Sequence, residues 1–97
     1  MFIATNGEIQ ARVRVYHWWP EKEWWGECPI PAFITKRARE KESKYLTYAE
    51  VMFEAIRPFS YALCCPRDAP SRKMGRTIAF GRLNKELESF GFRLEEK

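Results

Sequence analysis

The chain has 97 residues, of which 45% are hydrophobic and 15% aromatic, and its formal net charge is +4. This length supports one modest core, and the hydrophobic content is too high for a disordered chain. We therefore predict a single folded domain over residues 1–97. The sequence has no signal-peptide pattern and no apolar run of about 18 residues, which predicts a cytoplasmic protein that does not contact a membrane.

The first 18 residues predict a β-hairpin. Asn6 and Gly7 can supply the two positive-φ residues of a tight type I′ turn. After this turn, apolar residues alternate with polar ones, which predicts a strand with one face toward the core. The apolar positions are Ile9, Ala11, Val13 and Val15.

Residues 18–31 are rich in tryptophan and proline and predict a loop packed onto the sheet, followed by a further strand at residues 32–36. The tryptophans are Trp18, Trp19, Trp24 and Trp25. Next to Lys22 such rings could stack nucleic-acid bases, but three neighbouring glutamates would repel a phosphate backbone. We therefore favour a role in core packing or in a subunit interface. The charged segment 36–44 fits either an exposed helical turn or a mobile loop.

The segment LTYAEV predicts the start of a helix. Thr47 and Glu50 have capping-box spacing, and Leu46 and Val51 occupy the positions of a hydrophobic staple. We expect a short helix over residues 48–56, ended before Pro58. The apolar run at residues 59–65 is bounded by prolines and predicts a buried strand.

A longer helix is predicted over residues 71–89, with Asp68 or Ser71 as its cap and Gly91 as its stop. A last short strand is expected at residues 92–94. The fold class is therefore α+β. We expect a small antiparallel sheet that begins with an N-terminal hairpin and packs against a C-terminal helix and one shorter helix.

The start of the longer helix carries unusual charge. From Arg57 to Lys85 the sequence holds seven cations and one acid. Arg72 and Arg76 lie one turn apart, and cations there forgo the roughly 0.3–1 kcal/mol that an acid would contribute at this end of the helix dipole. A bound anion would make the interaction of these cations with the start of the helix favourable, which predicts a phosphate-binding site. Its residues are Ser71, Arg72, Lys73, Arg76 and Arg82.

Two other interpretations of these cations stay open. Asp68 and Glu54 could neutralise the arginines in ion pairs, or the patch could bind a protein. Gly75 and Gly81 each cost about 1 kcal/mol inside a helix, which predicts close approach of a ligand or of neighbouring backbone. Met74 and Ile78 lie on the opposite side of the helix and predict that protein covers that side too.

Phe59 and Tyr61 could flank a base or sugar, although core packing is the commoner role of such rings. His17 has no carboxylate or cysteine at ligand spacing, so we expect no metal site and no cofactor. Three cysteines without C-x-x-C spacing predict reduced thiols, and Cys65 has no neighbouring histidine. We therefore expect a binding protein and not an enzyme.

The segment CPRDAPSRKMGRTIAFGR, Cys65 to Arg82, resembles a pattern of small bacteriophage and prophage proteins, roughly C-x-P-x-D-x-x-S-R-K-x-G-R-x-I-A-x-G-R. It is similar to phage anti-defence proteins, including the Thoeris anti-defence family, which sequesters cyclic ADP-ribose isomers without cleaving them. The resemblance implies a cytoplasmic protein of the infected host, a homodimer or larger oligomer, with Arg72 and Arg76 as phosphate contacts. The alternatives are an anti-CRISPR-like inhibitor that binds a host immune protein or its nucleic-acid groove, and a DNA- or RNA-binding accessory protein.

Overall fold

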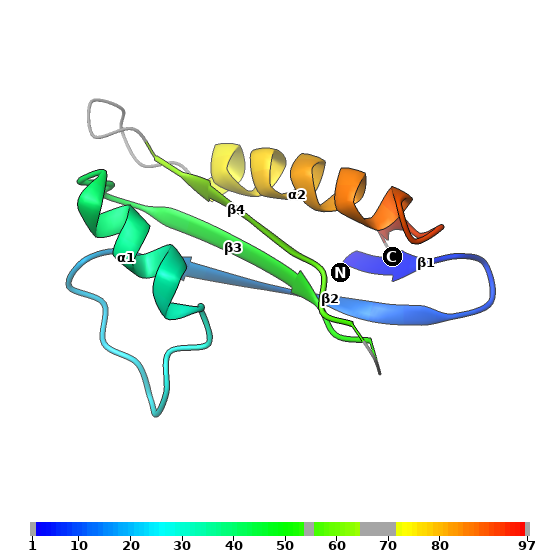
Figure 1. The fold of residues 1–97 in the computed structure, drawn as a ribbon, viewed down its shortest axis with the longest axis horizontal. Helices are drawn as coiled ribbons and strands as arrows, with labels where there is room; N and C mark the ends of the chain where they lie inside the picture. Colours follow the sequence, from blue (N-terminus) through cyan, green and yellow to red (C-terminus); the bar gives the residue numbers. More distant parts are fainter. Residues whose placement is uncertain (1, 54–55, 65–71, 97) are drawn as a thin grey trace.

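Five antiparallel strands and two helices make up the fold of the described residues (Figure 1). The computed structural model describes residues 2–53, 56–64 and 72–96. Its elements are β1 (Phe2–Thr5), β2 (Gln10–Trp18), α1 (Ala32–Glu40), β3 (Leu46–Val51), β4 (Phe59–Leu63), α2 (Arg72–Glu88) and β5 (Arg93–Glu96). The strands lie in the order β4-β3-β2-β1-β5, and every neighbouring pair is antiparallel. The predicted α+β class, with an N-terminal hairpin and a C-terminal helix, is confirmed.

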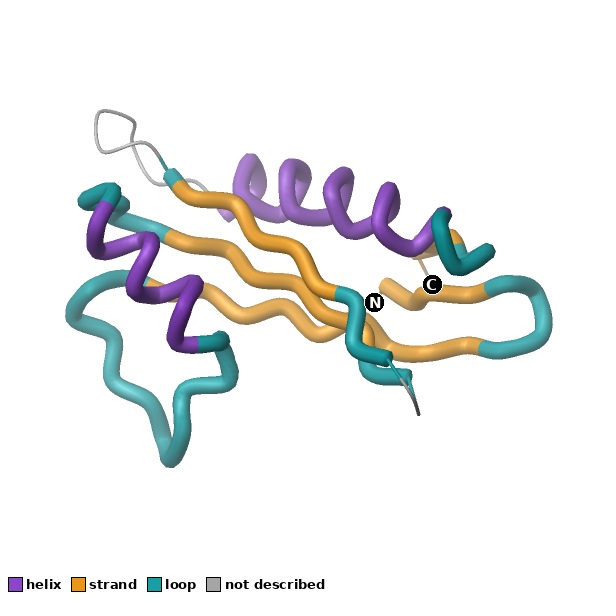
Figure 2. Tube along the Cα trace, viewed as in Figure 1, coloured by secondary structure: helices purple, strands orange, loops and turns teal. Residues whose placement is uncertain are grey.

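The two helices pack on opposite faces of the sheet (Figure 2). A hydrophobic core lies on each face of the sheet. Alternate side chains of a strand point to opposite faces, so β3 contributes side chains to both cores. The α1-side core consists of Trp18, Ile30, Ile34, Ala38, Leu46 and Tyr48. The α2-side core consists of Ala4, Val13, Ala49, Val51, Ala62, Ala79, Leu83 and Leu87. Leu83 and Leu87 are fully buried, and burial of such a side chain contributes about 1.5–3 kcal/mol.

The predicted helix over residues 48–56 is wrong, because residues 46–51 form an interior strand of the sheet, β3. All six residues of β3 are buried. Tyr48 faces α1 and Ala49 faces α2, so an extended chain buries both sets of side chains, whereas a helix would leave one set without a core. The capping-box spacing of Thr47 and Glu50 is therefore coincidental, and tertiary pairing decides the conformation.

The strand predicted at residues 32–36 is also wrong, because this segment begins α1. Ile34 and Ala38 lie four residues apart, on one helical face, and both are fully buried against the sheet. Pro31 occupies the N-cap position. Of the charged segment 36–44, for which the sequence left a helical turn or a loop open, residues 36–40 belong to α1 and residues 41–44 are not helical.

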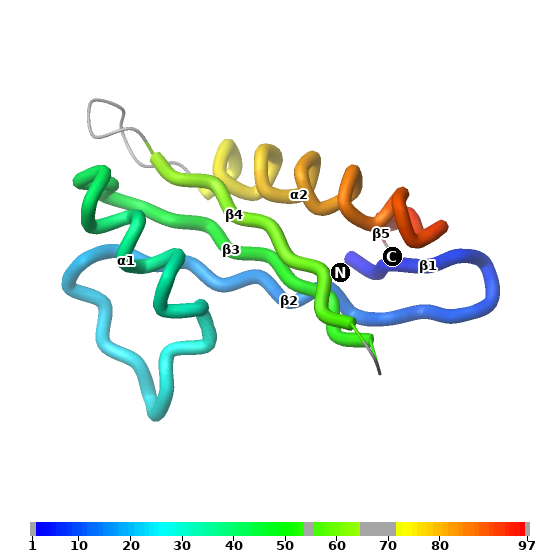
Figure 3. The backbone as a smooth tube through the Cα atoms, in the orientation of Figure 1, coloured from blue at the N-terminus to red at the C-terminus, as the bar shows by residue number. Residues whose placement is uncertain are grey.

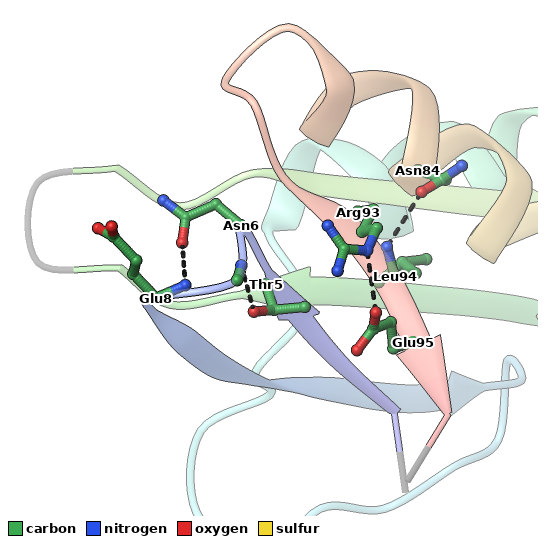
Figure 4. Close-up of polar contacts among 8 residues, drawn as sticks. Thr5, Asn6, Glu8, Asn84, Arg93, Leu94 and Glu95 are labelled. Carbon is green, nitrogen blue, oxygen red and sulfur yellow. Dashed lines mark hydrogen bonds and ion pairs between the residues drawn. The ribbon is translucent and has the colours of Figure 1, made fainter.

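The N-terminal hairpin is confirmed, but its turn differs from the predicted one (Figure 4). Thr5 and Gln10 form the last pair of the ladder, so the loop has four residues, 6–9, and not two. Gly7 has a φ of 99°, whereas Asn6 keeps a negative φ. The Asn6 Oδ1 atom instead accepts hydrogen bonds from the backbone N–H groups of Glu8 at 2.9 Å and Ile9 at 2.8 Å. Asn6 thus acts through its side chain.

The later elements are close to their predicted ranges. The strand predicted at residues 59–65 is β4, which lies at an edge of the sheet, so that only Ser60 and Ala62 are buried. The predicted long helix is α2, and Gly91 follows it with a φ of 80°. Met74 is 63% exposed and Ile78 is 42% exposed, so the prediction that protein covers their side of α2 is wrong.

The strand predicted at residues 92–94 is β5, which begins one residue later and ends two residues later. It pairs with β1, so the first and last strands of the described chain lie side by side (Figure 3). Asn84 of α2 accepts a hydrogen bond from the backbone N–H of Leu94 at 3.1 Å, which ties β5 to the helix (Figure 4). None of the helices in the described residues is long and apolar enough to cross a bilayer.

Candidate anion-binding site at the start of α2

The first turns of α2 lie directly against the middle of the sheet. His17 of β2 and Thr47 of β3 are register partners on the face that α2 covers. Gly75 of α2 lies above Thr47, and a Cβ atom at Gly75 would overlap the Thr47 hydroxyl oxygen. The missing side chain therefore lets the helix approach β3 closely, as the sequence predicted for Gly75. At Gly81 a Cβ would meet nothing within 4 Å, so close approach of neighbouring backbone does not explain that glycine.

Replacing Gly75 by alanine is expected to destabilise the fold by about 1–3 kcal/mol, because overpacking at Thr47 outweighs the gain in helix propensity. Gly81→Ala is the matched control in the same helix, and it should add about 1 kcal/mol of stability because its Cβ enters open space. Urea denaturation of both variants measures the difference. If Gly75→Ala stabilised the protein as much as Gly81→Ala does, the close packing of Gly75 against Thr47 would be contradicted.

Arg72 and Arg76 lie on either side of Gly75 and are exposed. Within the described residues, no carboxylate lies within ion-pair distance of either guanidinium. The ion-pair partners that the sequence suggested, Asp68 and Glu54, lie outside the described residues, as does the predicted site residue Ser71. Lys73, between the two arginines, is exposed as well. The start of α2 therefore presents three cations to solvent.

His17 lies partly buried beside these cations. Its Nδ1 atom is 3.3 Å from the Thr47 hydroxyl, and its ring stacks on Tyr45 with ring centres 5.4 Å apart. Burial lowers the pKa of His17 below its usual value of 6.5, and the positive charges of Arg72, Arg76 and Lys22 lower it further. Burial is thus the main cause of the lowered pKa, and the neighbouring cations add to it.

Tyr45 adds an unusual buried group to the same site. Its side chain is 8% exposed and lies between the rings of His17 and Trp19. The Tyr45 hydroxyl has no hydrogen-bond partner among the described residues. A buried hydroxyl without a partner costs about 1–3 kcal/mol, and Tyr45 reaches the site through its ring contact with His17.

A groove of about 370 Å³ continues from these residues along α2, and we call it the β2–α2 groove. Apolar side chains form much of its lining, and the rings of Phe2 and Phe80 have centres 4.4 Å apart. The described residues that line it are Phe2, Arg12, Val13, Val15, His17, Arg76, Phe80 and Glu96. The volume falls within the range of small-molecule sites, and the groove is open to solvent.

The structure separates the other predicted site residues from Arg72 and Arg76. Arg82 donates a hydrogen bond to the backbone carbonyl of Tyr61 at 2.7 Å, on the β4 side of α2. Phe59 and Tyr61 line a second groove with Arg82, of about 440 Å³. The site predicted from the sequence therefore combined residues that lie on different sides of α2. It missed Tyr45, Thr47 and Glu96, which only strand pairing and helix packing bring into place.

The four tryptophans have different environments. Trp18 is 3% exposed and belongs to the α1-side core, and Trp24 packs against the same core. Trp19 stacks on Tyr45, and the ammonium group of Lys22 lies 4.7 Å and 4.0 Å from the ring centres of Trp19 and Trp24. Trp25 is fully exposed. The predicted core role is confirmed for Trp18, and an interface role stays a prediction for Trp25.

The fold and the groove define a small α+β protein with a basic surface beside a partly apolar groove. In the residues that the structure describes, no group of three histidine, cysteine or carboxylate side chains could hold a metal ion. Comparison with protein-family models, with curated proteins and with solved structures finds no match to this chain.

The pKa of His17 gives a direct test of the site's electrostatics. The folded-state pKa of His17 lies below 6.5. The contribution of neutral His17 to the free energy of unfolding is therefore fully present above pH 6.5, and it is lost as pH falls from 6.5 toward the folded-state pKa. His17 is the only histidine, so its proton NMR signal needs no assignment. Arg72→Gln and Arg76→Gln should each raise this pKa, and Lys85→Gln, in the last turn of α2, should not. An unchanged pKa in both arginine variants would refute the proximity of these charges.

Proposed function

We propose that this chain is a non-enzymatic phage anti-defence protein that captures a phosphate-bearing small molecule. The phosphate binds to Arg72 and Arg76, and the remainder of the ligand occupies the β2–α2 groove. A cyclic nucleotide signal is the specific form of the proposal, and it rests on the phage-like motif from Cys65 to Arg82. The proposal supposes binding without turnover.

The observation that carries this proposal is the pair of arginines at the start of α2. Two exposed guanidiniums without a described carboxylate partner stand at the positive end of a 17-residue helix. Such a guanidinium can form paired hydrogen bonds with phosphate oxygens. A bound phosphate would convert an unfavourable accumulation of charge into a favourable one.

Two neighbouring features support a ligand larger than phosphate alone. The β2–α2 groove begins at Arg76 and has the apolar surface that a nucleobase or ribose can cover. Glu96 lines the same groove and could accept a hydrogen bond from a sugar hydroxyl or a base amino group. Among the described residues, His17 contacts a threonine hydroxyl and no carboxylate, an arrangement that suits binding better than general-base catalysis.

The test is recovery of the ligand. The protein is incubated with ADP, cyclic ADP-ribose and a short single-stranded DNA in turn, desalted, weighed by native mass spectrometry and then denatured. We expect one nucleotide to be retained, to raise the melting temperature and to be released with its mass unchanged. Release of a cleaved product would contradict the non-enzymatic role. Retention of DNA alone, with an affinity that falls steeply with salt, would favour the nucleic-acid-binding alternative.

The bound state has a second signature at His17. An anion held by Arg72 and Arg76 offsets the charges that lower the pKa of His17. Binding should therefore raise this pKa, and affinity should increase as pH falls through the range in which His17 gains its proton. A ligand that binds without moving the His17 titration occupies a different site.

A further inference from the structure

The outer edge of β4 has a defined pattern of backbone groups. The backbone N–H of Val51 donates to the carbonyl of Pro58 at 3.0 Å, and that of Cys64 donates to the carbonyl of Tyr45 at 2.8 Å. Hydrogen-bonded pairs alternate along an antiparallel ladder, so the even-numbered residues between these two points face β3. The residues whose N–H and C=O groups face away from the sheet are Phe59, Tyr61 and Leu63.

One of these outward groups already has a partner. The Arg82 guanidinium donates to the carbonyl of Tyr61 at 2.7 Å, which confirms the outward direction of that carbonyl. An edge with outward backbone groups is a template for another strand, and proteins commonly shield such edges with charged side chains. Arg82 therefore shields the centre of the β4 edge in the free protein.

A groove of about 440 Å³ follows this edge and is separate from the proposed ligand site. Two arginines line it, Arg37 from α1 and Arg82 from α2, and these helices cover opposite faces of the sheet. No carboxylate in the described part of the chain lies within ion-pair distance of either arginine. Beside the groove, the exposed rings of Phe33 and Phe59 have centres 6.0 Å apart.

We propose that the β4 edge binds an extended segment of a partner protein that carries two adjacent acidic residues. Successive side chains of a strand point to opposite faces of the sheet. Acids at consecutive positions of an added strand would therefore meet Arg82 on one face and Arg37 on the other. The backbone of the segment replaces Arg82 at the Tyr61 carbonyl, and the released guanidinium binds a carboxylate.

The charges favour a partner protein over a second copy of this chain. Two β4 edges paired with each other would bring four arginines together at the seam. The β5 edge carries the adjacent acids Glu95 and Glu96, but Glu95 is already ion-paired within its own chain. Glu95 is bound by Arg93 at 2.9 Å, and Glu96 lines the β2–α2 groove.

The test uses two fluorescent eight-residue peptides of identical composition, measured by fluorescence anisotropy with the full chain. Each peptide has two glutamates in a background of valine and threonine, adjacent in one peptide and separated by one residue in the other. Separated glutamates point to the same face, so that peptide can reach only one arginine. We expect the adjacent-glutamate peptide to bind about tenfold more tightly. Equal affinities would overturn the proposal.

Two protein variants identify the groove. Arg37→Gln and Arg82→Gln should each reduce the affinity for the adjacent-glutamate peptide to that of the separated one. Lys85→Gln, an exposed cation of α2 outside the groove, is the matched control and should change nothing. Arg72→Gln should also leave peptide binding unchanged, so failure here and failure of the proposed ligand site are distinguishable. Full affinity in both groove variants would exclude this edge.

Peptide methylation tests the strand geometry. Methyl groups on every second amide nitrogen block one edge of the peptide, and the complementary set blocks its other edge. Addition to β4 predicts that one methylated peptide binds and the other does not. Binding of both, or of neither, would contradict strand addition.

Sedimentation of the peptide-free protein tests for a second copy at the same edge. If the protein self-associates and Arg37→Gln abolishes that association, a second copy and not a partner occupies the edge.

Discussion

Replacing Trp18 by alanine is expected to destabilise the protein by about 3–5 kcal/mol. Trp18 is 3% exposed, lies at the end of β2 and packs with Ile34 and Leu46 in the α1-side core. The substitution removes the largest side chain of that core and leaves a cavity between α1 and the sheet. A domain of this size has a total stability of about 5–15 kcal/mol, so the loss is severe.

Trp25→Ala is the matched control, since it removes the same side chain from a fully exposed position. Its effect on the free energy of unfolding should stay within about 0.5 kcal/mol. Denaturation monitored by circular dichroism compares the two. Trp18→Phe preserves an aromatic ring and gives a measurable value if Trp18→Ala does not fold. Equal losses at positions 18 and 25 would contradict the division of the tryptophans between core and surface.

Local patterns were sufficient to predict the elements that have one exposed side or long periodicity. The alternation after Gly7 predicts β2, and the apolar spacing of Ala79, Leu83 and Leu87 predicts α2 with both of its ends nearly correct. Residues 10–15 of β2 and the length of α2 each bury one face, which is the condition under which a repeat of two or 3.6 residues is visible in a sequence.

The interior strand β3 could not be predicted in this way, because it is buried on both faces and has no polar alternation. Its Thr47 and Glu50 then mimic a helix start. The neighbouring helix α1 has the opposite difficulty. Its buried face consists mainly of Ile34 and Ala38, too little apolar surface within nine residues to distinguish a helix from a strand.

The candidate site was predicted only as far as one helix allows. Arg72 and Arg76 lie four residues apart, and spacing alone places them together. At 100° per residue, Arg82 lies about 240° around the helix from Arg76, a signal that could have separated it from the pair. His17 and Thr47 are 30 residues apart, and only the β2–β3 register and the packing of α2 bring them to the arginines.

The assignment of a phosphate site rests on Arg72 and Arg76. Replacing both arginines should have the second large effect, a loss of phosphate binding. A charge-assisted hydrogen bond is worth about 1.5–3 kcal/mol, so loss of both guanidiniums should weaken phosphate binding by about 3 kcal/mol or more. This corresponds to an affinity reduced by at least about 100-fold. Both side chains are exposed, so Arg72→Gln/Arg76→Gln should fold with wild-type stability or slightly higher.

The most direct measurement is isothermal titration calorimetry of pyrophosphate, ADP and cyclic ADP-ribose into the wild-type protein, the Arg72→Gln/Arg76→Gln double variant and Lys85→Gln. The account predicts that at least one of these ligands binds to the wild-type protein and to Lys85→Gln with similar affinity. In the double variant the same ligand should bind at least about 100-fold more weakly. Absence of binding by all three ligands, or equal affinity in all three proteins, would contradict the assignment of a phosphate site to the start of α2.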